Sequence, residues 1–341
     1  MGGDFRKLDP ALADWLEACD ELLAAQDVAL HERPLRAALL LVRHAVVKVN
    51  EHGTEETIDE HVGLGDVIEK RWFGSLVRMS EGWYAKTVGP AALRPPESSA
   101  AGVVMHRGAI QLIKIPLVLT ELAEVAHRKW IAFPDQVADA EDVLGWVVPA
   151  LDRNHIRAEE LVALSAKIRG VAGSIRFIAS RARNASEGSE EQAGLLAGGF
   201  RNLEAFAQLA VIGDRAERQK AWWELQMASE SFLKALCLQK GRPGGYRKTH
   251  SLPDLVGDAE QCGIEFDVAR LSDWPSQNEV SEFRYATGRR ATSTELLFAY
   301  ELTLDLCLAA VSALDVRLDT GKARFLIQPL PWRLREVENR E

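Results

Sequence analysis

The dominant pattern along the chain is an apolar side chain every three or four residues, which is typical of amphipathic helices. The clearest stripe keeps a 3,4,3,4,3 spacing through Leu161, Leu164, Ile168, Val171, Ile175 and Ile178. Similar stripes run through residues 196–210, 222–236 and 297–314. Thr292 and Glu295 have the spacing of a capping box at the start of the last of these. The chain from residue 152 to about residue 315 is therefore predicted to be mainly helical.

The first 150 residues mix helices with a β signal. Asp9 followed by Pro10 predicts the start of a first helix. A second helix is predicted to begin at Pro34 and to end at Gly53, and a third to cover about 66–85. In the Val- and Ile-rich run "GVVMHRGAIQLIKIPLVL", the Arg107-Gly108 pair lies between two apolar segments, which predicts a β-hairpin. This is the only convincing β signal in the chain.

These changes in the hydrophobic pattern along the chain predict a mainly α fold with four segments. We expect an N-terminal α+β domain with a small hairpin or sheet at 1–150 and a helical connector pair at 151–214. An up-and-down helical bundle is expected at 215–318, followed by a tail at 319–341 with one edge strand in "ARFLIQPL". The N-terminal domain matches no pattern that assigns it a role, and its α+β pattern is compatible with a module that binds a partner or a ligand.

Composition narrows the classes of function. The chain has 341 residues, 47% of them apolar, and a net charge of −9. An acidic chain lacks the overall basic surface of a general nucleic-acid coat protein. Its four cysteines form no C-x-x-C pair, which favours reduced, buried thiols. No signal peptide and no apolar run of about 20 residues occurs, so we expect a cytoplasmic protein without a membrane span.

Several chemistries are not supported by any motif. There is no H-E-x-x-H, no G-x-S-x-G and no G-x-G-x-x-G after a strand, so neither a metal nor a cofactor is expected. The stretch "GRPGGYRKTHSLPDL" is rich in glycine and cations, but Lys248 follows Arg247 rather than Gly, which is the wrong register for a phosphate-binding P-loop. Ser251 and Asp254 instead predict an N-capped helix start.

Residues 216–316 resemble the HEPN superfamily of small helical bundles. The resemblance rests on "LKAL" in a long helix, "THSLPDL" at the start of the next and "RY" after a third. The matching residues are Leu233, Lys234, Ala235, Leu236, Thr249, His250, Leu252, Leu255, Arg284 and Tyr285. It covers under a third of the chain. It implies a bundle that forms homodimers, and it implies either nucleotide or RNA binding or a protein partner such as a nucleotidyltransferase.

Two loops of this region carry clustered cations. They are Arg242, Arg247 and Lys248 in the first loop, and Arg284, Arg289 and Arg290 in the second. If both loops meet at one end of the bundle, they form an anion site, because arginine holds phosphate bidentately and a tyrosine stacks on a base. The residues expected to bind phosphate are Arg242, Arg247, Lys248, His250, Arg284, Tyr285 and Arg289. The alternative is two solvated loops that never meet.

Many HEPN proteins are metal-independent ribonucleases with an R-x4–6-H motif. Counting from Arg284, the histidine position is filled by Arg289, Arg290 or Ala291, and no histidine follows His250. We therefore expect a non-catalytic protein that dimerises and binds nucleotide or RNA phosphate. A divergent ribonuclease that uses His250 and Arg284, and a purely structural interaction module, stay open as alternatives.

Overall fold

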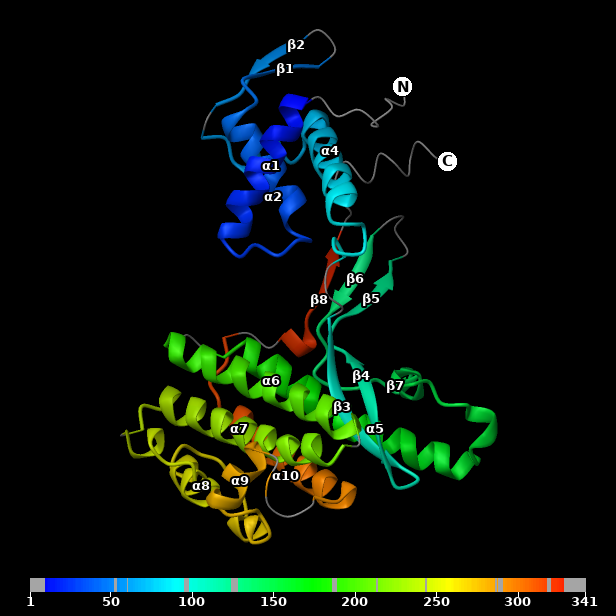
Figure 1. Cartoon of the computed structure of the whole chain (residues 1–341), viewed down its shortest axis with the longest axis vertical. Helices are drawn as coiled ribbons and strands as arrows, with labels where there is room; N and C mark the ends of the chain where they lie inside the picture. The colour runs from blue at the N-terminus through cyan, green and yellow to red at the C-terminus, as the bar shows by residue number, and fades with distance from the viewer. Residues whose placement is uncertain are drawn as a thin grey trace. The chain divides into compact units, whose positions relative to one another are not determined.

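The computed structural model describes residues 10–51, 54–59, 61–94, 98–123, 128–185, 189–212, 214–242, 244–285, 287, 291–317 and 320–327. These residues are mainly helical, with small antiparallel sheets, which confirms the predicted fold class (Figure 1). They fall into two compact units. The first consists mainly of residues up to 94, and the second of Ser98–Ala123 and Lys129–Leu326. Each unit is described separately below.

The first unit is a small helical cluster with a two-stranded sheet. Its elements are α1 (Pro10–Ala25), α2 (Arg33–His44), β1 (Lys48–Glu51), β2 (Thr54–Thr57), α3 (Leu64–Val67) and α4 (Arg71–Thr87). The core forms where α1, α2 and α4 pack together, and it includes Leu16, Leu41, Phe73 and Tyr84, each at most 1% exposed. Apolar side chains repeat at helical spacing on all three helices, which explains why they pair.

The prediction of the second helix is wrong for its C-terminal part, after residue 44. α2 ends at His44, and the chain then turns into the β1–β2 hairpin, in which Val49 lies opposite Glu56. The run "VVKVNE" is rich in β-branched valine, which favours an extended backbone, but the spacing of four and then three residues between Val42, Val46 and Val49 also resembles a helix face. The hairpin at Arg107-Gly108 is therefore not the only β signal in the chain, contrary to the prediction.

The predicted hairpin at Arg107-Gly108 is confirmed. Strands β3 (Ser99–His106) and β4 (Ala109–Pro116) pair along their whole length, and β7 (Val147–Val148) adds to the far side of β4. Arg107 and Gly108 have φ of 47° and 76°. Positive φ at both central positions is the requirement of the tight two-residue turn whose twist matches that of the strands.

This hairpin packs on helices that lie further along the chain. α5 (Ala158–Arg183) and α6 (Glu190–Ile212) contact β3, and Val103, Ile113 and Ile115 share one core with Ile168 and Phe206. Five successive residues of β3 are buried. Because consecutive side chains point to opposite faces, both faces of this strand are covered by other parts of the second unit. The sequence-based boundary at residue 150 therefore does not coincide with the boundary between the compact units.

Close packing at Gly102 on β3 makes a stability prediction. A Cβ atom there would lie 2.9 Å from Cδ1 of Ile175 and 3.1 Å from Cδ1 of Ile115. Gly102→Val is expected to lower the free energy of unfolding by about 1–3 kcal/mol, the usual cost of overpacking a core. The measurement is urea unfolding, with Gly198→Val on α6 as the control because nothing lies within 4 Å of its Cβ position. Equal losses in both variants would rule out the packing explanation.

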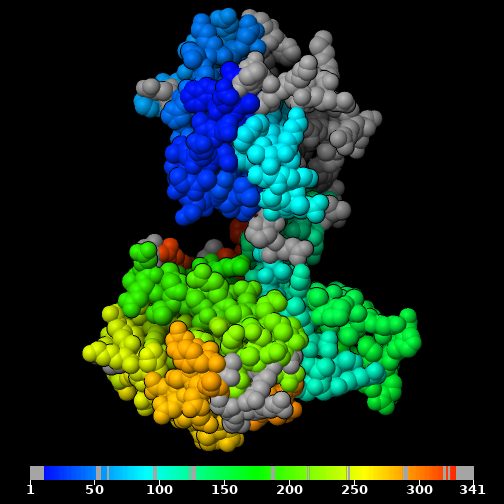
Figure 2. Space-filling view, viewed as in Figure 1, coloured from blue at the N-terminus to red at the C-terminus, as the bar shows by residue number. Residues whose placement is uncertain are grey.

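The remaining helices complete a bundle around α7 (Arg215–Gln239). They are α8 (Leu252–Glu260), α9 (Gln277–Arg284) and α10 (Ser293–Ser312). In the space-filling view of Figure 2, the yellow-green to orange surface of the second unit belongs to these segments. The predicted caps are confirmed: the Ser251 side chain accepts from the Asp254 N–H, and Thr292 and Glu295 form a capping box. Both caps fix where a helix begins, and so they position the loops before α8 and α10.

A further small sheet joins β5 (Leu119–Leu122), β6 (Lys129–Ala132) and β8 (Arg324–Ile327), which confirms the strand predicted near the C-terminus. Short 3₁₀ helices cover Val143–Trp146, Arg153–His155, Gly244–Arg247, Val268–Leu271 and Thr320–Lys322. The four cysteines carry free thiols, and three of them are buried. Within the described ranges, no helix combines the length and the apolar character that a bilayer span requires.

Candidate functional site

One face of α7 carries polar and aromatic side chains within an otherwise apolar bundle. Trp223, Gln226, Glu230 and Lys234 follow one another at a spacing of 3,4,4, so they form a line along the helix. We refer to these four residues as the α7 stripe. The loop before α8, the connection between α8 and α9 and the end of α9 contact this stripe. Most of the residues on which the HEPN resemblance rests lie on α7 and on these segments.

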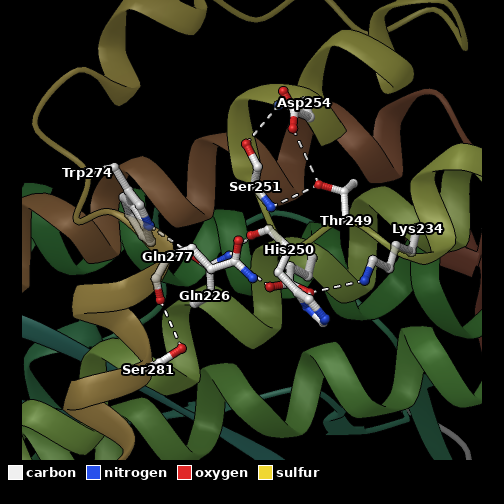
Figure 3. A network of polar contacts seen from close by, with 10 residues as sticks. Gln226, Lys234, Thr249, His250, Ser251, Asp254, Trp274, Gln277 and Ser281 are labelled. Carbon is white, nitrogen blue, oxygen red and sulfur yellow. Dashed lines mark hydrogen bonds and ion pairs between the residues drawn. The ribbon is translucent and has the colours of Figure 1, made fainter.

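Glu230 is the centre of the stripe's polar network. Its side chain is only 5% exposed. Oε1 accepts a hydrogen bond of 2.8 Å from Gln226 Nε2, and Oε2 accepts one of 3.1 Å from Lys234 Nζ. His250 Nδ1 lies 2.9 Å from the same Oε2 atom. Figure 3 shows these three partners around the carboxylate. A buried carboxylate is tolerated because donors surround it.

His250 is held at two points. Its ring contacts Glu230 through Nδ1, and its backbone carbonyl accepts a 2.8 Å hydrogen bond from Gln226 Nε2. The turn around it is fixed as well, because Thr249 Oγ1 accepts from the Ser251 N–H and donates to Asp254. The His250 side chain is 54% exposed. Since Nδ1 faces Glu230, Nε2 is the ring nitrogen available to a ligand, either as a proton donor or as an acceptor.

Trp274 anchors the connection between α8 and α9 to the same stripe. Its Nε1 donates a 2.8 Å hydrogen bond to Gln226 Oε1. Its ring meets the Trp222 ring edge-on, with centroids 5.3 Å apart. Gln226 therefore uses its oxygen for Trp274 and both amide hydrogens for Glu230 and His250 (Figure 3). The network fixes the relative positions of three segments that are far apart in sequence.

Arg284, the last residue of α9, lies at the other end of the stripe. Its Cζ atom is 5.1 Å from the Trp223 ring centroid and 5.7 Å from that of Tyr285, whose side chain is exposed. Such contacts hold a guanidinium without using its N–H groups. Within the described ranges, no oxygen accepts a hydrogen bond from Arg284.

Other arginines that lie over aromatic rings differ in this respect. Each has an oxygen acceptor as well: Arg176 with Glu141, Arg247 with Glu191, Arg270 with Asp305, Arg324 with Glu121, and Arg181 with backbone carbonyls. Arg270 is the closest match to Arg284, because it is also exposed and lies 5.4 Å from the Phe266 ring. It therefore provides a matched control for experiments on Arg284.

Two cations of the first loop are neutralised by acidic residues. Arg242 pairs with Asp258 on α8 at 3.0 Å, and Arg247 pairs with Glu191 on α6 at 3.1 Å. The hydrogen bond to Tyr246 and the nearby Glu191 charge raise the pKa of Arg247. Lys248 is exposed and has no partner among the described residues. Arg289 and Arg290 lie outside the described residues.

The structure does not bring Arg247 and Arg284, one residue from each predicted basic cluster, to one point. Arg247 binds Glu191, which lies near the N-terminus of α6 and so beside the C-terminal end of α7 in the paired α6–α7 hairpin. Arg284 lies over Trp223, near the start of α7. With a rise of 1.5 Å per residue, these positions are about 20 Å apart. His250 and Arg284 contact stripe residues that are two turns, about 10 Å, apart on one face.

Sequence reasoning missed the residues that organise this site: Trp223, Gln226, Glu230 and Trp274. The signal for two of them, Gln226 and Glu230, was present, because polar residues at 226, 230 and 234 lie on one line of the helix. Trp274 lies in an irregular connection, and its pairing with α7 has no local signature. Within the described ranges, no group of three His, Cys, Asp or Glu side chains could hold a metal ion.

Comparisons with protein-family models, with curated proteins and with solved structures found no match for this chain. The HEPN resemblance therefore stays a prediction. Any function has to be argued from the α7 stripe and the loops around it.

Proposed function

We propose that the protein binds the phosphates of single-stranded RNA or of a nucleotide along the α7 stripe, through Arg284, Lys248 and His250. The observation that carries the proposal is the Arg284 guanidinium, which is held by aromatic rings and has no oxygen acceptor among the described residues. An arginine in this state has its N–H groups available for a phosphate in the bidentate geometry that arginine favours.

The aromatic side chains beside Arg284 support the same ligand class. Tyr285 is 71% exposed, so its ring can stack on a base while Arg284 contacts the adjoining phosphate. His250 offers Nε2 about 10 Å further along the stripe. That spacing exceeds the size of one phosphate group, so a ligand with two or more phosphates fits both contacts better than inorganic phosphate does.

The proposal uses fewer residues than the sequence suggested. Arg242 and Arg247 add little net charge because Asp258 and Glu191 pair with them. With a net charge of −9 on the whole chain, attraction of an anion depends on local cations, and binding is expected to weaken steeply with salt. The cytoplasmic location, the homodimer and the protein partner expected from the sequence stay predictions.

Fluorescence anisotropy with a labelled single-stranded RNA and with labelled ATP tests the proposal. Arg284→Ala is expected to weaken RNA binding about tenfold, because one charge-assisted contact contributes about 1–3 kcal/mol. Arg270→Ala is expected to leave affinity within about twofold, since Asp305 already occupies that guanidinium. Absence of binding at about 25 mM salt, or equal losses in the two variants, would refute the proposal.

A ribonuclease is a second candidate, favoured by the His250–Glu230 contact. A histidine whose Nδ1 is held by a buried carboxylate has the arrangement of a general acid or base. Incubating the protein with end-labelled RNA separates the two functions. Cleavage that disappears in His250→Ala while RNA is still bound would establish catalysis. Intact RNA, bound by the wild-type protein, is the outcome expected from the first proposal.

A further inference from the structure

The tip of the β3–β4 hairpin lies beside the N-terminal half of α5, and the two elements form a small hollow in the second unit (Figure 1). The hollow has a volume of about 180 Å³. The hairpin contributes Met105, His106 and Arg107, and α5 contributes residues such as Ala163 and Lys167. None of the lining residues belongs to the α7 stripe, so the hollow is independent of the function proposed above.

Basic side chains with N–H groups available to a ligand line this hollow. Lys167 is exposed, His106 is half-buried, and neither side chain has a hydrogen-bond or ion-pair partner among the described residues. Arg107 uses Nε and Nη2 to bind Glu160 and the His155 carbonyl, whereas its Nη1 has no acceptor within the described ranges. A turn and a helix therefore supply donors to one small space.

The charge at the hollow is positive, although one carboxylate also lines it. Glu160 accepts hydrogen bonds of 2.8 Å from Arg107 and 2.7 Å from Arg157, so two guanidinium groups share one acid. These hydrogen bonds hold the pKa of Glu160 below its ordinary value. With Lys167 added, the cations at this point exceed the carboxylate by two charges, on a chain whose net charge is −9. A local excess of this kind favours an anion as the occupant.

A larger hollow adjoins the first one along the same face of α5. The two hollows share Met105 and Lys167, and the larger one has a volume of about 350 Å³. Its apolar walls include Val171 of α5 and Leu297 and Leu304 of α10. This volume lies within the range of small-molecule sites, about 300–1,000 Å³. An anionic ligand with an apolar body can therefore place its charge in the small hollow and its body in the large one.

Acidic side chains of α10 determine the direction in which such a ligand lies. Glu301 and Asp305 line the larger hollow and not the smaller one. Asp305 pairs with Arg270 at 2.6 Å, whereas Glu301 has no partner among the described residues. The Glu301 carboxylate repels an anionic group from the larger hollow, and Lys167 attracts it to the hairpin tip.

We propose that the two hollows together bind one small molecule, a phosphomonoester with an apolar body. The phosphate contacts Lys167, His106 and Arg107, and the body lies against Val171 and Leu304. A phosphate fits this site better than a carboxylate does, because its oxygens point in tetrahedral directions toward donors on two elements. Its charge of about −1.5 to −2 at neutral pH also matches the local excess of cations.

Two pairs of variants test the two halves of the site. Lys167→Gln removes a cation from the hairpin tip, and Lys220→Gln is its control, because Lys220 lies on α7 outside both hollows. Gly170 lines the larger hollow, and nothing lies within 4 Å of a Cβ placed on it, so Gly170→Leu fills the space without a clash. Gly173→Leu is the matched control, with equally open space on the same helix and no place in the lining. Leucine is a better helix former than glycine, so both glycine variants are expected to fold.

The probes are phenyl phosphate, inorganic phosphate and benzyl alcohol, and binding is measured by isothermal titration calorimetry. All titrations use the Arg284→Ala background, which removes the phosphate contact proposed for the α7 stripe. We expect phenyl phosphate to saturate one site and to bind about tenfold or more tightly than inorganic phosphate, because its ring is buried in the larger hollow. Benzyl alcohol, which has the ring without the charge, is expected to show no saturable binding.

The variants are expected to affect the probes differently. Lys167→Gln should weaken phenyl phosphate and inorganic phosphate alike, each about tenfold, whereas Gly170→Leu should weaken phenyl phosphate about tenfold and leave inorganic phosphate within about twofold. Both controls should stay within about twofold of the background. The inference is overturned if phenyl phosphate does not bind in this background, if inorganic phosphate or benzyl alcohol binds as tightly, or if Lys167→Gln or Gly170→Leu has no effect on phenyl phosphate.

Discussion

Replacing Arg176 by methionine is expected to lower the free energy of unfolding of the second unit by about 3–5 kcal/mol. The Arg176 side chain on α5 is fully buried. It donates two hydrogen bonds of 2.7 Å to the carboxylate of Glu141, and two more to the carbonyls of Pro116 (2.9 Å) and Gln136 (2.8 Å). Methionine has a similar length but leaves Glu141 and both carbonyls without their donor. An unpaired charge and two orphaned acceptors account for the size of the loss.

The Arg176–Glu141 ion pair also predicts that the free energy of unfolding depends on pH. Burial acts to raise the pKa of Glu141, but the hydrogen bonds from Arg176 and from the backbone of Ala138, together with the arginine charge, outweigh it, so the pKa lies below its ordinary value. A carboxyl whose pKa is lowered by folding stabilises the fold at pH values above its unfolded pKa, about 4.3. That contribution is lost as the pH falls through the lower pKa of the folded state. Glu141→Gln should lack this part of the acid sensitivity.

The measurement is urea unfolding followed by hydrogen exchange at the amides of β4, which reports on the second unit alone. Arg153→Met is the control, because the Arg153–Asp142 pair is a surface pair with both side chains exposed. Such pairs contribute about 0–1 kcal/mol. If Arg176→Met costs no more than Arg153→Met, the buried pair is not a main support of the packing between β4 and α5.

Glu230→Ala is expected to have the second-largest effect, a loss of about 2–4 kcal/mol. The substitution removes the acceptor of Lys234, whose side chain is only 13% exposed, and it also frees one Gln226 amide hydrogen and the Nδ1 atom of His250. A nearly buried ammonium without a carboxylate is costly, and the loss of two further hydrogen bonds adds to this. The loop before α8 is expected to lose its attachment to α7.

One readout and one control variant separate this role from general destabilisation. Nitrogen NMR of the wild type is expected to show a proton on Nδ1 of His250, because that atom faces the carboxylate; Glu230→Ala should lose this preference. Glu260→Ala, an exposed acidic residue on α8, is the control and is expected to change stability by less than about 0.5 kcal/mol. An unchanged His250 spectrum in Glu230→Ala would contradict the network.

The sequence was most informative where one signal was strong and local. The long apolar stripes, the Arg107-Gly108 turn and the caps at Ser251 and Thr292 each follow from residues within one element. The end of α2 was misread because valines spaced by three and four fit a helix face as well as a strand. Local pattern cannot separate these two states when a short segment is rich in β-branched residues.

Long-range contacts explain the other differences. The first loop looked like an anion site because it contains no acidic residue, but Glu191 and Asp258 reach it from α6 and α8. The β3–β4 hairpin precedes the helices that cover it, so chain order assigned it to the first 150 residues. Glu230 is one of three acidic residues on α7, and its role depends on donors from α7 itself and from the loop before α8. Only the folded chain brings such partners together.

The most direct test of the proposed function is the salt dependence of single-stranded RNA binding by the wild type and by Arg284→Ala. Each phosphate contact contributes about 0.7 to the slope of log K against log salt concentration for a single strand. If Arg284 binds a phosphate, its removal should reduce the slope by about 0.7, while Arg270→Ala leaves it unchanged. Equal slopes for the wild type and Arg284→Ala would contradict the assignment of the α7 stripe as a phosphate-binding surface.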